Sequence, residues 1–163
     1  MSKITPCLWF DGKAEEAANF YVSLLPNSRV DKVMLSPADN PSTPAGAVLT
    51  VEFTLAGQPF MGLNGGPQFP FTEAVSFSID CEDQAEVDRL WEALTKGGGS
   101  PGPCGWLKDR FGLSWQIVPR ALPKMLNDAN REAAGRVMQA MLKMGKIDIA
   151  GLKRAYEAKP VAS

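Results

Sequence analysis

An internal repeat constrains the fold of this chain more than any other feature. A strand pattern, an amphipathic helix pattern and further strand patterns occur in the same order twice within 163 residues, with three further strands in the first copy and two in a shortened second copy. The helix positions Phe20, Tyr21 and Leu24 recur 70 residues later as Leu90, Trp91 and Leu94. The alternative is a chance coincidence of two amphipathic helices, but the matching order of strands, helix and turns favours two copies of one βαβββ unit.

The first copy is predicted from its alternating and helical periodicities. Residues 4–10 alternate as a strand does, and Asp11 is a candidate helix cap. The apolar residues of the following helix recur at i, i+3, i+4 and i+7, and Pro26 ends it. Three strands are then predicted over residues 28–36, 47–55 and 59–64, the last two joined by a hairpin turn.

The second copy repeats this order in a shortened form. A strand is predicted over residues 74–81, and Asp83 with Glu86 forms a capping-box pattern at the start of the next helix. Three consecutive glycines, 97–99, end that helix, and strands are predicted over 104–109 and 114–118. The fold class is therefore α+β, with βαβββ modules at 3–66 and 73–119 forming one domain, 1–120.

Residues 121–163 are predicted to form a C-terminal helical extension. Their apolar residues follow one helical stripe that is rich in methionine, and a second, shorter helix comes after it. Such a stripe is typical of core packing or of a subunit contact.

Composition excludes several classes of partner. The net charge is −1, so there is no basic surplus that would bind the phosphates of a nucleic acid. No apolar run approaches the roughly 20 residues that span a bilayer. The first residues lack the charged and apolar regions of a signal peptide. We therefore expect a cytoplasmic protein with neither a nucleic-acid nor a membrane partner.

The chain contains no histidine and three cysteines, Cys7, Cys81 and Cys104. The absence of histidine removes the commonest metal ligand and the usual acid-base group near neutral pH. No CxxC spacing is present, so the cysteines are interpreted as free, buried thiols. The alternative, a nucleophilic cysteine, needs a neighbouring base or positive charge.

Several segments together resemble a known family. They are residues 4–12 with Phe20-Tyr21, then 63–67, 104–112 and 114–119. These segments resemble the PhnB-like branch of the vicinal oxygen chelate superfamily, also labelled demethylubiquinone methyltransferase-like, over about residues 3–145. The superfamily includes glyoxalases, extradiol dioxygenases and bleomycin-resistance proteins. The resemblance implies paired βαβββ modules whose mixed sheets curl into a cup around a ligand.

The resemblance also implies where a metal would be held, and the residues at those positions are unsuited to it. The superfamily's ligand positions fall on Thr5, Asn64, Ala74 or Ser76, and Gln116. Neutral amides and hydroxyls are poor ligands for divalent metals, so we expect no metal and no cofactor. Glu52, Glu73 and Asp80 lie near these strands and leave an unusual site open.

The methyltransferase label fits the sequence poorly as an activity. A Rossmann-like methyltransferase has a glycine-rich turn that leads from a strand into a helix. Here Gly65-Gly66 leads into a proline-rich segment, and Gly97–Gly99 follows a helix.

We therefore predict a metal-free protein that binds a small molecule of undefined identity. The predicted ligand contacts are Thr5, Cys7, Trp9, Asn64, Phe69, Ser76, Trp106 and Gln116. Alternatively, the tryptophans are packing residues, and Asn64 and Gln116 bond to backbone groups. The other candidate is an enzyme of undetermined, lyase- or transferase-like reaction, with Glu73, Asp109 or Tyr21 as acid-base groups and Cys104 as a thiol.

A homodimer is expected, because cup-like folds leave strand edges that need covering. The methionine-rich helix offers additional apolar area for such a contact. The sequence leaves open whether the modules pair within one chain or are exchanged between protomers.

Overall fold

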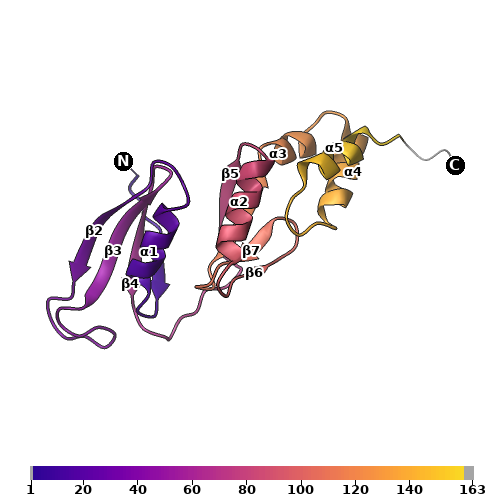
Figure 1. Cartoon of the computed structure of the whole chain (residues 1–163). Coiled ribbons are helices and arrows are strands. Elements are labelled where there is room, and N and C mark those ends of the chain that lie inside the picture. The colour runs from indigo at the N-terminus through magenta and orange to yellow at the C-terminus, as the bar shows by residue number, and fades with distance from the viewer. Residues whose placement is uncertain (1, 160–163) are drawn as a thin grey trace. The chain divides into compact units, whose positions relative to one another are not determined.

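The computed structural model describes residues 2–159, and these form two compact units (Figure 1). The first unit comprises the described residues up to Phe71, and the second comprises those from Thr72 onward. Residues 160–163 of the predicted extension lie outside the described residues.

The first unit is a four-stranded mixed sheet with one helix. Its elements are β1 Cys7–Phe10, α1 Ala14–Val22, β2 Arg29–Leu35, β3 Val48–Leu55 and β4 Gln58–Asn64. The strand order is β1-β4-β3-β2; β1 and β4 are parallel and the other pairs are antiparallel. The sheet is open, with β1 and β2 at its edges.

The second unit repeats this topology and adds three helices. Its elements are β5 Ser76–Cys81, α2 Gln84–Thr95, β6 Ser100–Pro101, β7 Trp106–Lys108, β8 Ser114–Pro119, α3 Ala121–Leu126, α4 Arg131–Met141 and α5 Ile149–Glu157. The order β5-β8-β7-β6 matches that of the first sheet, and β5 and β8 are again parallel. The predicted α+β class with two βαβββ modules and C-terminal helices is confirmed.

Each sheet buries one face under its own helix. In the first unit, Ala14, Ala17 and Ala18 of α1 are fully buried and let the helix approach the sheet closely. A Cβ added to Gly62 of β4 would lie 3.1 Å from the Ala14 Cβ. In the second unit, Leu90 of α2 and Ile117 of β8 are fully buried. Apolar alternation in the strands and the helical apolar face therefore meet as the sequence patterns predict.

The N-termini of the two module helices differ in whether a nearby residue caps them. At α2 the Asp83 side chain accepts a hydrogen bond from the Glu86 N–H at 2.9 Å, so the predicted cap is confirmed. At α1 the predicted cap, Asp11, is wrong. The helix begins at Ala14, and its N–H donates instead to Oδ1 of Asn64, 50 residues away, at 2.9 Å.

The second module differs from the predicted boundaries at three places. The predicted strand 104–109 is shorter because Cys104 and Gly105 have positive φ angles of 57° and 84°. Strand β6 has two residues and was not predicted. Helix α3 was also missed; Pro123 lies in its first turn, where a missing N–H costs no helical hydrogen bond.

The C-terminal helices form their own apolar cluster within the second unit, and Figure 1 shows them gathered together. Its fully or nearly fully buried members are Leu122, Val137, Ile147 and Leu152. Val118 of β8 packs against this cluster, so the extension is continuous with the core of the module. Tyr156 closes the cluster by donating its hydroxyl to Asp128 at 3.0 Å.

Candidate functional site

A cavity of about 420 Å³ lies in the second unit along β6 and β7. Side chains alternate along a strand, so Leu107 points toward α2 while Trp106 and Lys108 point away from it. The cavity therefore opens on the sheet face that α2 leaves uncovered. Its lining residues are Glu73, Ser100, Pro101, Gly102, Pro103, Cys104, Trp106, Leu107, Lys108 and Ser114.

Ser114 is the most informative residue of this cavity. Its side chain is 1% exposed, and its hydroxyl has no hydrogen-bond partner among the described residues. A buried hydroxyl without a partner costs about 1–3 kcal/mol. A hydroxyl can both donate and accept, and rotation of the Ser114 side chain toward the cavity would let a polar group of a ligand remove this cost.

An ion pair borders the same cavity. The Lys108 ammonium contacts the Glu73 carboxylate, and both side chains are partly exposed. The hydrogen bond from Lys108 holds the pKa of Glu73 below its usual value. Glu73 is therefore ionised at neutral pH, which makes it a weak candidate for the acid-base group considered from sequence.

Three of the predicted site residues lie together on this uncovered face. Trp106 of β7 is directly opposite Gln116 of β8 in the strand register. The Gln116 Nε2 donates to the Ser76 hydroxyl of β5 at 3.0 Å. Trp106 also lines the cavity, so it joins the cavity to the Gln116–Ser76 pair.

The predicted site residues of the first unit form a separate group. The indole N–H of Trp9 donates to the Gly66 carbonyl at 2.8 Å, and the Phe69 ring meets the Trp9 ring edge-on with centroids 5.0 Å apart. A Cβ at Gly65 would lie 2.3 Å from the Trp9 ring, so only glycine allows this packing. Cys7 is exposed on β1, and Thr5 is exposed just before that strand.

Asn64 lies on the opposite face of its sheet from these residues. Its Oδ1 accepts from the Ala14 N–H, and its Nδ2 donates to the Val48 carbonyl at 3.0 Å. The Asn64 side chain is 7% exposed. Its amide therefore joins α1 to the sheet, in line with the alternative that it satisfies backbone groups.

Asp109, another acid-base candidate, has a structural set of contacts. The carboxylate is 2% exposed and accepts from the backbone N–H groups of Phe111 and Leu113 and from the Trp115 indole N–H. These bonds hold the turn between β7 and β8.

The residues at the superfamily's metal positions do not fit a metal centre. Asn64 bonds to the backbone of α1 and β3, and Gln116 bonds to Ser76. Within residues 2–159, no three His, Cys, Asp or Glu side chains gather closely enough to hold a metal ion. The four ligand positions therefore provide no anionic oxygen or thiolate.

Sequence reasoning missed Ser114 as a site residue. It occupies one position in a strand whose pattern predicts burial, between Leu113 and Trp115. The only available signal was a small hydroxyl residue inside that apolar run. Its missing hydrogen-bond partner becomes visible only in the folded unit.

Two open βαβββ sheets, each with one covered face, match the paired modules that the resemblance to the vicinal oxygen chelate superfamily implies. Residues 2–118 match the family described as 3-demethylubiquinone-9 3-methyltransferase, and the chain belongs to that family. The predicted resemblance to the PhnB-like branch is thereby confirmed.

Solved structures agree with this placement. A PhnB protein from Bacillus cereus is 35% identical, with a TM-score of 0.64, and the match covers 72% of this chain and 99% of that one. Protein PA1353 from Pseudomonas aeruginosa is 26% identical, with a TM-score of 0.58 and coverages of 73% and 98%. None of the curated proteins matches the chain. No helix in residues 2–159 has the length and apolar character needed to cross a membrane.

Proposed function

We propose that this protein binds a small organic molecule, without a metal, in the cavity of the second unit. The observation that carries the proposal is the buried, unpaired Ser114 hydroxyl in a cavity of about 420 Å³. Pockets for small molecules commonly combine apolar walls with a few polar groups. Trp106, Pro101 and Pro103 supply such walls, and Ser114 supplies a polar group.

The proposed ligand has an apolar body and one hydrogen-bonding group that bonds to the Ser114 hydroxyl once this side chain rotates toward the cavity. Screening small organic compounds by quenching of tryptophan emission tests this, because Trp106 lines the cavity. Ser114→Ala is expected to weaken binding by about 1–3 kcal/mol. The same substitution should leave stability unchanged or raise it, because it removes an unpaired buried hydroxyl without removing a partner.

Ser78→Ala is the matched control, since Ser78 is exposed on β5 of the same sheet. It should change neither ligand affinity nor stability measurably. Equal affinity in the Ser114→Ala variant and the wild-type protein would contradict the proposed site.

Gln116 extends the proposed site beyond the cavity. Its amide lies next to Trp106 in register and already bonds to Ser76. If a ligand reaches this amide, Gln116→Ala should weaken its binding by about 1–3 kcal/mol, measured by the same quenching titration. Unchanged affinity would restrict the site to the cavity itself. The contacts predicted for Thr5, Cys7, Trp9 and Phe69 stay predictions.

The second candidate function, an enzyme of lyase- or transferase-like reaction, is favoured by the family's name alone. Neither glycine-rich turn leads from a strand into a helix, as a Rossmann-like methyltransferase site requires. Elemental analysis separates the candidates. We expect no stoichiometric divalent metal in the purified protein, and about one zinc, iron, nickel or manganese per chain would favour the enzyme.

The proposal also includes a homodimer. The edge strand β2 exposes Met34 and Leu35, at 39% and 54%, and exposed apolar edge strands are normally covered. Light scattering at micromolar protein is expected to give twice the chain mass; the monomer mass alone would contradict this.

The three free cysteines suit a reducing compartment, so we also propose a cytoplasmic location.

A further inference from the structure

The C-terminal extension lies beyond the residues that the family shares. The family match ends at residue 118, whereas helices α3 to α5 occupy residues 121–157. The extension is nevertheless built into the second unit through its apolar cluster. It therefore adds to this module contacts that the family's shared residues do not supply.

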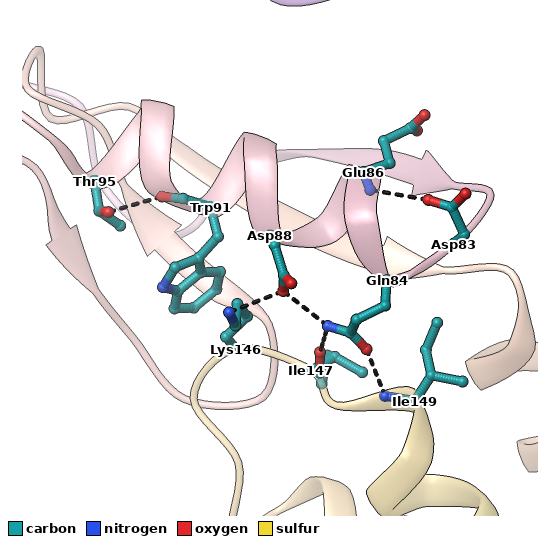
Figure 2. A network of polar contacts seen from close by, with 9 residues as sticks. All are labelled: Asp83, Gln84, Glu86, Asp88, Trp91, Thr95, Lys146, Ile147 and Ile149. Atoms are coloured by element: carbon teal, nitrogen blue, oxygen red, sulfur yellow. Dashed lines mark hydrogen bonds and ion pairs between the residues drawn. The ribbon is translucent and has the colours of Figure 1, made fainter.

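Residues 144–149, which lead from α4 to the first residue of α5, are fixed to α2 by specific polar contacts (Figure 2). The Gln84 amide donates to the Ile147 carbonyl at 2.9 Å and accepts from the Ile149 N–H at 2.8 Å. Lys146 forms an ion pair with Asp88 at 2.8 Å. Side chains of one helix thus hold three positions of this segment, which we name the brace.

The brace also holds one wall of the cavity. The Cys104 N–H donates to the Met144 carbonyl and the Gly105 N–H to the Gly145 carbonyl, both at 2.8 Å. Residues 102–104 line the cavity. The fully buried Ile147 packs so closely on this wall that a Cβ at Gly105 would lie 3.1 Å from its Cγ1.

The backbone of this wall is strained at Cys104. Cys104 has a φ of 57°, a left-handed conformation that costs an ordinary residue about 1–2 kcal/mol. The Cys104 N–H donates to the Met144 carbonyl of the brace. Detaching the brace therefore removes a hydrogen bond at the strained residue.

We propose that the brace sets the conformation of the 102–105 wall and thereby controls ligand affinity in the cavity. The effect on ligand affinity rests on the proposed function. The effect on the wall rests on the hydrogen bonds that join Cys104 and Gly105 to the brace. Because linkage is reciprocal, a ligand that favours the closed wall also favours the docked brace. Any event that releases residues 144–149 from α2 would then release the ligand.

The thiol of Cys104 reports the state of the wall. Cys7→Ser serves as the background because Cys7 is exposed. Cys81 contributes little, since burial raises its pKa to about 12. In this background, Gln84→Ala is expected to raise the rate of Cys104 labelling by a disulfide reagent about tenfold, because two hydrogen bonds that dock the brace are lost.

The control variant is Gln139→Ala, on the exposed face of α4, which should label at the background rate. Lys146→Ala should also speed labelling, and Lys146→Arg should restore the slow rate by keeping the ion pair with Asp88. Hydrogen exchange at the Cys104 and Gly105 amides should accelerate while the global unfolding midpoint changes little. Unchanged labelling and exchange in both Gln84→Ala and Lys146→Ala would overturn the proposal.

Affinity is measured with anilinonaphthalene sulfonate as the probe. We expect the dye to bind the wild-type protein in a manner that depends on Ser114, and Gln84→Ala to weaken it about tenfold, matching the labelling effect. Faster labelling with unchanged dye affinity would overturn the proposed effect of the brace on ligand affinity. Absence of Ser114-dependent binding in the wild-type protein would count against both the proposed function and the effect of the brace on affinity. The labelling rates would still test whether the brace sets the conformation of the wall.

Discussion

Replacing Asp109 by asparagine is expected to destabilise the second unit by about 2–4 kcal/mol. An asparagine can keep one oxygen for the backbone N–H groups of Phe111 and Leu113. Its other terminal atom is then an amide nitrogen that faces the Trp115 indole N–H, so two donors meet where a carboxylate accepts a bond at 2.9 Å. Urea unfolding followed by near-ultraviolet circular dichroism measures the loss.

Asp11→Asn is the matched control, because Asp11 is exposed and its predicted role as a helix cap is wrong. It should change the free energy of unfolding by less than about 0.5 kcal/mol. If Asp109→Asn were equally silent in stability but abolished ligand binding or turnover, Asp109 would belong to the functional site. A stability loss with unchanged affinity in the folded protein would place it in the turn.

The fold could be predicted from the sequence because the apolar patterns of its helices and strands are local and occur twice. Periodicity locates both helices and most strands, and the helix positions shared by Phe20 and Leu90 identify the repeat. The Asp83 cap was predictable for the same reason, since donor and acceptor are three residues apart. Burial then follows from the apolar faces that these elements present.

The missing parts depend on contacts between distant residues. The partner of the Ala14 N–H is an amide 50 positions later, and no local pattern points to it. The left-handed backbone at Cys104 is held by residues of the extension, 40 positions away, so the strand predicted over 104–109 was too long. Helix α3 is obscured by Pro123, which is read more easily as a helix terminator than as part of a first turn.

The candidate site was predicted less well than the fold. Trp106, Ser76 and Gln116 could be brought together from strand parity and the family resemblance, and the structure places them on one sheet face. Ser114 could not, because its distinguishing property is a missing partner. A site defined by an unsatisfied group becomes recognisable only after every other hydrogen bond has been assigned.

Leu90→Ala is expected to cost about 2–5 kcal/mol, because it removes a fully buried side chain from the contact between α2 and its sheet. Gln116→Ala should cost less, since Gln116 is partly exposed and loses one hydrogen bond, to Ser76. Denaturant unfolding measures both values.

In ligand binding the order of the two variants should reverse, with Gln116→Ala having the larger effect. Leu90 of α2 packs against the covered face of the sheet and does not line the cavity, so Leu90→Ala should keep wild-type affinity under conditions where it remains folded. Gln116 lies beside Trp106 on the uncovered face, so for a ligand that reaches its amide the loss should act on affinity more than on stability. This reversal separates the two faces of one sheet by function. A Leu90→Ala variant that stayed as stable as the wild-type protein would contradict the assignment of the α2 face of the sheet to the core.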